Sequence, residues 1–272
     1  MEEIDDTYES EGAGGITDLF EKEAYWEIER FFYENKASVF YGRQLEVLFE
    51  DRYFHWVTNR TLRLLVEQRI IVSETRQLKW GGNVTLYWQG SFRYYKREAQ
   101  KVIDIVERYS IDKVGSSIGH YGELLVVEGF AKIRFLLLGR NVSVLEDKKW
   151  EYSGHNLDMV VERDGVRYGV EVKNTLRYMD KGEFEAKIKM CKYFGVRPVF
   201  VVRMLPKSWV QFLIREGGFA LILKYQLYPE ILDDLALSMK TYLRLPVDTP
   251  KSLYDGTMKR FENWHMKHVN LN

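Results

Sequence analysis

The sequence predicts an α/β protein whose mixed sheet is flanked by helices and preceded by a mostly helical domain. Two features of the 272-residue chain support this prediction. Up to about residue 90, apolar residues recur at helical spacing and are followed by two β-rich runs around Gly81-Gly82. From about residue 111, helical and alternating patterns take turns, and Asp164-Gly165 is a favoured two-residue hairpin turn. Hydrophobic residues make up 46% of the chain, which is enough to form cores.

Three helices and a hairpin are expected in the N-terminal part. Apolar residues close to helical spacing define the first two helices, and either Thr58 or Asn59 is a favourable N-cap for the third. The expected elements are helices over 20–34, 43–50 and from Thr58 or Asn59 to about 69, and strands over 70–73 and 84–88.

Helices and strands alternate in the remainder of the chain. Ser91 is the expected cap of a connecting helix, and a long apolar run follows it. The expected elements are helices over 91–110, 118–138, 181–194 and 208–215, strands over 142–145, 198–203 and 219–224, a hairpin over 156–174, and further helices from Pro229. This alternation is typical of a mixed α/β domain.

The formal net charge of zero is the sum of two opposite parts. Residues 1–20 hold seven acidic side chains and no basic one, whereas residues 52–97 hold nine Lys or Arg and two Glu. An acidic head that contains glycines is typical of a solvated tail, and the rest of the chain carries a net charge of +7. The folded part is therefore mildly basic.

Several classes of protein are excluded by composition. Cys191 is the only cysteine, which excludes a disulfide framework and a cysteine-rich zinc site and fits a reducing cytoplasm. No uncharged apolar stretch approaches about 18 residues, and the acidic start is unlike a signal peptide, so we expect a cytoplasmic protein with no membrane partner. The glycines at 12–15 are not followed by Lys-Ser or Lys-Thr, so no nucleotide cofactor is expected.

The order helix, helix, helix, hairpin resembles a winged helix-turn-helix domain. Asn59, Arg60 and Arg63 lie on or near the face of the third helix opposite its apolar stripe, and the hairpin adds Arg76 and Lys79. Such a helix can enter the major groove of DNA while the wing contacts phosphates. The alternative is a three-helix domain used for protein contact or dimerisation, with solvated arginines.

The predicted hairpin over 156–174 places two carboxylates opposite each other. With a two-residue loop, paired positions add up to 329, so that Asp158 faces Glu171 and Glu162 faces Arg167. Like charges directly opposite destabilise a sheet unless a cation lies between them. Oxygen-only ligands in this arrangement suit Mg²⁺ or Mn²⁺ rather than zinc.

The remaining hairpin residues sort onto two faces by the same alternation. Gly169 lies beside Glu171 and is expected to leave room there for a bound group. The opposite, core-facing set is Leu157, Met159, Val161, Tyr168, Val170 and Val172.

The helix before the hairpin supplies a third carboxylate. Glu123 shares a stripe with Val126 and Phe130, so we expect it to be buried, which is costly unless it is paired or coordinates a metal. The alternative is a solvated glutamate at the helix end near Gly122.

Together these residues resemble the PD-(D/E)XK nuclease superfamily, whose restriction-endonuclease-like fold carries a helix Glu, a strand Asp and a Glu-x-Lys motif on the next strand. Glu-x-Lys occurs elsewhere in the chain, but only Glu171 and Lys173 lie on an alternating strand with a paired upstream Asp158. The segment GVEVKNT is most similar to archaeal Holliday-junction resolvases and Mrr-like nucleases. The proline of the nominal motif is absent, since Leu157 precedes Asp158.

The resemblance implies metal-dependent hydrolysis of phosphodiester bonds. Lys173 would orient the attacking water or stabilise the developing negative charge. Lys187 and Lys189, on the following helix, are candidate phosphate contacts, although solvated surface is the alternative for either one alone. The implied ligands of Mg²⁺ (or Mn²⁺) are Asp158, Glu171, the Val172 carbonyl and, directly or through water, Glu123.

We therefore predict a divalent-metal-dependent DNA endonuclease, with a winged-helix module that positions the DNA. A homodimer is expected because cutting both strands requires two active sites. The alternative is a non-catalytic DNA-binding regulator or assembly factor with an inactive nuclease fold. The expected domains are an acidic disordered tail (1–19), a winged helix-turn-helix domain (20–90), a connecting helix (91–110), a nuclease domain (111–245) and a C-terminal helical extension (246–272).

Overall fold

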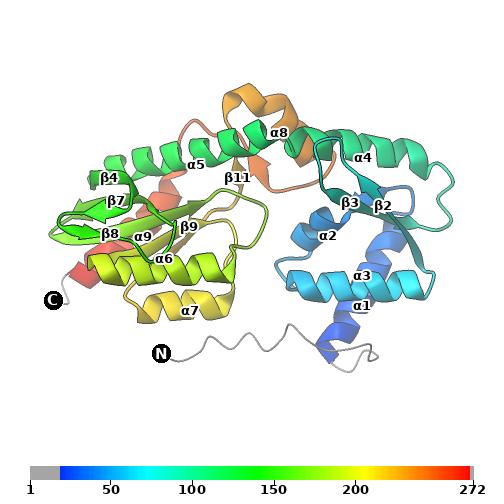
Figure 1. Ribbon diagram of the computed structural model, residues 1–272. Coiled ribbons are helices and arrows are strands. Elements are labelled where there is room, and N and C mark those ends of the chain that lie inside the picture. The colour runs from blue at the N-terminus through cyan, green and yellow to red at the C-terminus, as the bar shows by residue number, and fades with distance from the viewer. Residues whose placement is uncertain (1–18, 270–272) are drawn as a thin grey trace. The chain divides into compact units, whose positions relative to one another are not determined.

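The structure, a computed structural model, describes residues 19–269 (Figure 1). The chain forms two compact units, one ending at Glu107 and the other beginning at Arg108. The expected acidic tail lies, except for its last residue, outside the described residues.

The N-terminal unit packs three helices on a small antiparallel sheet with the strand order β1-β3-β2. Apolar side chains of the three helices form one core, which extends to Ile71 at the start of β2. The order of three helices and a hairpin agrees with the sequence prediction. The elements are α1 (Leu19–Glu34), β1 (Val39–Tyr41), α2 (Gly42–Leu48), α3 (His55–Glu67), β2 (Ile71–Gln77), β3 (Asn83–Gln89) and α4 (Tyr95–Tyr109), whose last two residues belong to the second unit.

Three details of this unit differ from the prediction. α3 begins at His55, because the extended backbone of Phe54 starts the helix about one turn earlier, and Thr58 is buried inside it rather than capping it. α4 likewise begins at Tyr95, beyond Ser91. The short strand β1 has no counterpart in the prediction, because three residues are too few to show an alternating pattern.

The C-terminal unit is built on a five-stranded sheet with the order β10-β9-β8-β7-β4. β8, β9 and β10 are parallel, whereas β7 pairs antiparallel with both β8 and β4. The strands are β4 (Leu136–Val142), β7 (Leu157–Arg163), β8 (Val166–Lys173), β9 (Arg197–Val202) and β10 (Phe219–Ile222).

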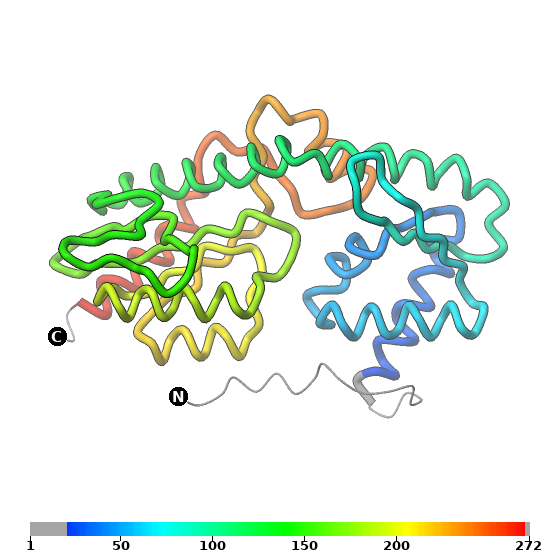
Figure 2. Tube along the Cα trace, viewed as in Figure 1, coloured from blue at the N-terminus to red at the C-terminus, as the bar shows by residue number. Residues whose placement is uncertain are grey.

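Helices cover both faces of this sheet. α5 (Asp112–Lys132) and α9 (Asp255–Val269) pack on one face, and α6 (Lys181–Phe194) and α7 (Lys207–Arg215) pack on the other (Figure 1). α5 and α9 meet near the end of α5, although they are far apart in sequence, with the ring centroids of Phe130 and Phe261 5.2 Å apart; Figure 2 traces both helices. A mixed sheet flanked by helices confirms the predicted fold class. The smaller elements are β5 (Val144–Leu145), β6 (Lys148–Lys149), β11 (Gln226–Leu227), η1 (Glu230–Leu232), α8 (Asp233–Thr241) and β12 (Val247–Asp248).

The long helix of this unit ends earlier than its apolar sequence predicts. The prediction of one helix over 118–138 is wrong at both ends, because α5 runs from Asp112 to Lys132. Arg134 adopts a φ of 64°, which no α-helix accepts, and the apolar residues that follow extend as the edge strand β4. Apolar composition alone could not separate a buried helix from an edge strand here.

The central hairpin has the predicted register. Met159 pairs with Val170 and Arg163 pairs with Val166, as a two-residue loop requires. Glu162 and Arg167 form the expected cross-strand ion pair, with Nε and Oε2 2.8 Å apart.

The predicted division of this hairpin into one core face and one ligand face is wrong in two places. Both faces are buried, and Leu157 packs with Val160 in the cluster beneath α6 rather than with Met159. Gly169 leaves no room for a bound group: a Cβ there would lie 2.7 Å from the Cys191 sulfur and 2.8 Å from a Leu157 methyl. The glycine is needed because these side chains approach the strand closely.

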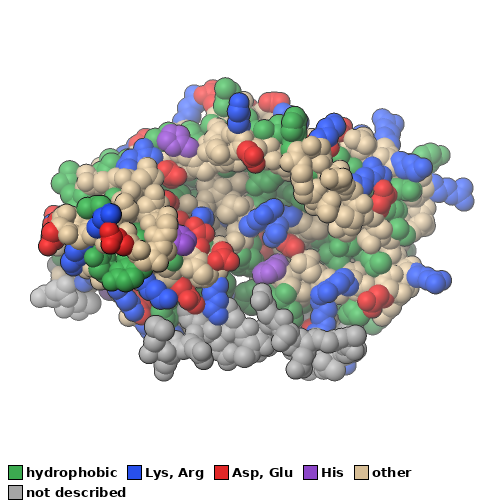
Figure 3. Space-filling model, in the orientation of Figure 1, with side chains coloured by type: hydrophobic (Ala, Val, Ile, Leu, Met, Phe, Trp, Pro, Cys, Tyr) green, Lys and Arg blue, Asp and Glu red, His purple; other side chains and the backbone are tan. Residues whose placement is uncertain are grey.

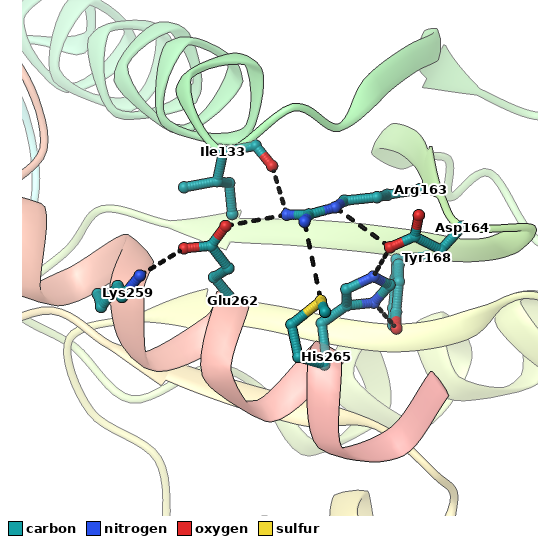
Figure 4. A network of polar contacts seen from close by, with 8 residues as sticks. Ile133, Arg163, Asp164, Tyr168, Lys259, Glu262 and His265 are labelled. Carbon is teal, nitrogen blue, oxygen red and sulfur yellow. Dashed lines mark hydrogen bonds and ion pairs between the residues drawn. The ribbon is translucent and has the colours of Figure 1, made fainter. Parts of the chain in front are cut away.

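A polar network ties the hairpin turn to the C-terminal helix (Figure 4). His265 of α9 is fully buried, with Nε2 3.1 Å from Asp164 Oδ2 and Nδ1 2.8 Å from the Tyr168 hydroxyl. Arg163 donates to the Glu262 carboxylate at 3.0 Å. His265 is thus a structural residue that holds α9 against the hairpin.

Replacing His265 with Phe is expected to lower the free energy of unfolding by about 1–3 kcal/mol, because Asp164 and Tyr168 each lose a hydrogen-bond partner. Denaturant unfolding of the two proteins measures this difference. In a Tyr168→Phe background the same substitution should cost less, since one of the two lost partners is already absent. An equal cost in both backgrounds would show that the Tyr168 contact adds nothing.

Candidate active site

Glu171 is the centre of the candidate site. It lies near the end of the central strand β8 and is only 2% exposed. Two ammonium groups flank its carboxylate: Lys187 Nζ is 2.5 Å from Oε2, and Lys173 Nζ is 3.7 Å from Oε1. Burial and then the negative charge of Asp158 raise the pKa of Glu171 to about 8, although both lysines oppose this shift.

Asp158 lies beside Glu171 on the neighbouring strand. The backbone pairing of β7 and β8 runs as far as Met159 and Val170, and beyond it Asp158 Oδ2 accepts a hydrogen bond from the Val172 amide at 2.7 Å. Burial raises the pKa of Asp158, and the negative charge of Glu123 adds to this effect. The two carboxylates therefore interact electrostatically, as the predicted register requires.

Lys173 is held by a second carboxylate on the next helix. Its Nζ lies 2.5 Å from Glu183 Oε1, and Asp180 caps α6 by accepting from the Glu183 amide at 3.0 Å. Burial lowers the pKa of Lys173, but the bond to Glu183 and the negative charge of Glu171 outweigh it and raise the pKa above its usual range. Lys173 is thus a fixed, positively charged group.

Glu123 is not the buried carboxylate that its apolar stripe predicts. Its side chain is 26% exposed, and its Oε2 lies 3.1 Å from Arg140 of β4. The adjacent Gly122 lets α5 approach the end of β8, because a Cβ there would lie 2.7 Å from the Asn174 Cβ. Asn174 in turn donates to the Ile118 carbonyl of α5 at 2.8 Å. This packing brings Glu123 near enough to influence Asp158.

The donor set suits a hard divalent cation, although it is not gathered into a finished ligand group. Within residues 19–269, no cluster of three or more His, Cys, Asp or Glu is close enough to hold a metal ion. The buried Glu171 and the half-buried Asp158 nevertheless provide an oxygen-only pair, which is the chemistry that Mg²⁺ and Mn²⁺ prefer. Lys187 supplies the positive charge beside Glu171.

The sequence does not predict three side chains that pair with site residues: Arg140 with Glu123, Glu183 with Lys173, and Lys187 with Glu171. Lys187 is also a correction, because its side chain is only 4% exposed and it cannot act as the direct phosphate contact expected of it. One signal was available, since Lys187 lies on the apolar stripe formed by Phe184, Ile188 and Cys191 of α6. Lys189, by contrast, is exposed.

The candidate DNA contacts of the N-terminal unit differ in their partners. Asn59 Nδ2 donates to Glu46 at 2.8 Å, and Arg60 lies 2.8 Å from Glu21. Arg63 is exposed and forms no ion pair within the described residues.

The two candidate DNA contacts on the β2–β3 hairpin, Arg76 and Lys79, are also paired with acidic side chains. Arg76 lies 2.6 Å from Glu74, and Lys79 Nζ lies 3.0 Å from Glu107. On the face shown in Figure 3, Lys and Arg side chains are interspersed with Asp and Glu. Arg63 is consequently the candidate most available to a phosphate or a base.

The comparisons with known proteins add little to this geometry. No family model matches the sequence, and no curated protein matches it. A solved chain described as "Structure of EndoMS-dsDNA2 complex" is similar at 13% identity and a TM-score of 0.30, over 56% of this chain and 64% of that chain. A similarity of this strength does not establish a shared function. In the part of the chain that the structure describes, no helix is long and apolar enough to span a membrane.

Proposed function

We propose that the protein is a divalent-metal-dependent DNA endonuclease. The observation that supports this most strongly is the pair formed by the buried Glu171 and the half-buried Asp158 on adjacent strands, with Lys173 two residues along β8. Burying neighbouring carboxylates is costly, so groups with pKa values raised in this way are candidates for a functional site. The resemblance to PD-(D/E)XK nucleases supports the same chemistry.

Each side chain of the site has a role in this proposal. A bound cation would polarise the phosphodiester and lower the pKa of the attacking water. Lys173, held in place by Glu183, would orient that water or stabilise the negative charge that develops on the phosphate. Lys187 positions Glu171. The residues that would hold the cation are Asp158, Glu171, the Val172 carbonyl and Glu123.

A substrate panel tests the proposal. The full chain is incubated with duplex, junction, flap and single-stranded DNA in Mn²⁺, in Mg²⁺ and in EDTA. We expect cleavage of at least one substrate with either metal and none in EDTA. Because cutting both strands requires two sites, we also propose a homodimer, which sedimentation would detect. Absence of cleavage of every substrate in the panel would contradict the proposed nuclease activity.

We further propose that the N-terminal unit binds duplex DNA in the manner of a winged helix, with Arg63 as a contact. Arg63→Ala should weaken binding in EDTA and lower the slope of log affinity against log salt by about 1, as loss of one phosphate contact does. Arg30→Ala is the control. Arg30 is also an exposed arginine, but it lies on α1 and is paired with Glu34 at 3.9 Å, so its loss should not change DNA binding. Equal effects of the two variants would remove Arg63 from the interface.

One observation favours a second candidate, a DNA-binding regulator without catalysis. Lys187 Nζ already lies 2.5 Å from Glu171 Oε2, so the site contains a cationic side chain of its own. Calorimetric titration with Mn²⁺ separates the candidates. Binding that Asp158→Asn removes supports the nuclease, whereas no binding, or binding that this variant leaves unchanged, supports the regulator.

A further inference from the structure

Helix α6 presents two different surfaces. Glu183 and Lys187 point toward the candidate active site and bind Lys173 and Glu171. Other residues of the same helix line a cavity of about 480 Å³, which is within the usual range of about 300–1,000 Å³ for ligand pockets. The opposite wall is the segment that leads into β7. The main lining residues are Trp150, Tyr152, Ser153, Glu185, Lys189 and Tyr193.

Three aromatic side chains, Trp150, Tyr152 and Tyr193, form an aromatic cluster in this cavity. The Tyr152 ring centroid lies 5.0 Å from that of Trp150 and 5.8 Å from that of Tyr193, at steep interplanar angles of 60° and 75°. Trp150 is buried and its indole N–H donates to Ser153 at 2.9 Å, which fixes the segment. Tyr152 is 77% exposed, so an aromatic face is held open to a ligand.

Charged side chains lie near this aromatic cluster. Glu185 and Lys189 are spaced i, i+4 on α6, a spacing that commonly gives an ion pair, yet neither forms an ion pair within residues 19–269. Lys148 Nζ donates to the Tyr193 carbonyl at 3.1 Å, which places a second ammonium group beside the C-terminal end of α6. Both lysines suit the phosphates that flank a bound base. The carboxylate of Glu185 would repel a phosphate inside the cavity but can accept a hydrogen bond from an amino group.

The wall of the cavity is attached to the candidate active site. Lys187, which holds Glu171, also donates to the Asn156 carbonyl, three residues after Ser153. A ligand in the cavity would therefore lie on a segment fixed by the same lysine that positions Glu171.

We propose that this cavity binds an unstacked nucleobase of a DNA strand, which stacks on Tyr152 while Lys189 and Lys148 contact the flanking phosphates. This inference rests on the proposed function, because it supplies the strand that the nuclease would cut. Aromatic rings stack on bases regardless of sequence, and loss of one such ring typically weakens binding about 5- to 150-fold. An enzyme that acts on a base-paired strand would have to extrude that base into the cavity.

Binding of a short single-stranded oligonucleotide that carries 2-aminopurine tests this inference. The full chain is titrated in EDTA, so cleavage does not interfere, and stacking is followed by quenching of the 2-aminopurine fluorescence. We expect Tyr152→Ala to weaken binding about 5- to 150-fold and to abolish the quenching. Tyr152→Phe keeps the ring and should retain both, and the exposure of Tyr152 makes both variants compatible with folding.

The outcomes separate this inference from the proposed function. Absence of oligonucleotide binding, wild-type binding by Tyr152→Ala, or equal losses in Tyr152→Ala and Tyr152→Phe would each overturn the nucleobase site, even if the protein cleaves DNA. Binding that depends on the Tyr152 ring, in a protein that cleaves no substrate with metal, would overturn the nuclease and leave the nucleobase site standing.

Discussion

Asp158→Asn is expected to reduce metal-dependent DNA cleavage by on the order of 1,000-fold or more, because a ligand of the cation accounts for several kcal/mol of transition-state stabilisation. The substitution removes the negative charge but keeps an oxygen that can accept from the Val172 amide, so the end of the hairpin stays closed. Single-turnover cleavage at saturating Mn²⁺ measures the loss, and duplex binding in EDTA should be unchanged.

Glu162→Gln is the matched control for this prediction. Glu162 is on the same strand and the same side as Asp158, but it pairs with Arg167 near the turn and not with the candidate site. We expect this variant to cleave at the wild-type rate. Full activity of Asp158→Asn, or an equal loss in both variants, would remove Asp158 from the catalytic site.

Lys173→Met tests the other half of the site with the same assay. It removes the fixed ammonium group but leaves Glu171 paired with Lys187. Metal binding measured by calorimetry should therefore persist while cleavage is lost. Loss of metal binding in this variant would mean that Lys173 maintains the site rather than acting on the substrate.

The sequence predicts the backbone around the candidate site correctly where local geometry decides. The two-residue turn at Asp164-Gly165 fixes the register of the hairpin, and with it the approach of Asp158 to Glu171. The predicted bounds of α6 match the structure, because Asp180 caps its start and Gly195, with a φ of 69°, ends it.

The prediction is wrong where tertiary contacts decide. Glu123 lies on an apolar stripe of α5, which predicts that its side chain is buried. In the structure its side chain is partly exposed and pairs with Arg140 of the edge strand β4. The side of β8 beside Gly169 is filled by Cys191 and Leu157, which no local pattern reveals. Neither contact involves residues close together in the chain, so spacing and periodicity do not report it.

Lys187 is the third residue whose position depends on a tertiary contact, because it is buried against Glu171 instead of being exposed to DNA. Lys187→Met is expected to lower the free energy of unfolding by about 3–5 kcal/mol, because it leaves the buried carboxylate of Glu171 without its closest cation. Methionine fills a similar volume among Phe184 and Ile188, so the cost arises from charge rather than from a cavity. Chemical denaturation at pH 9, above the pKa of about 8 of Glu171, measures it.

The double variant Lys187→Met/Glu171→Gln distinguishes a broken ion pair from a general packing defect. Removing both charges eliminates the unpaired buried ion, and well-packed neutral replacements of buried ion pairs are often neutral or stabilising. We therefore expect the double variant to be more stable than Lys187→Met, although it removes more polar groups. Lys189→Met, on the exposed side of the same helix, should change stability by less than about 0.5 kcal/mol. If the two substitutions at 187 and 171 add their separate costs, the buried lysine does not act through Glu171, and the positioning role assigned to it would have to be abandoned.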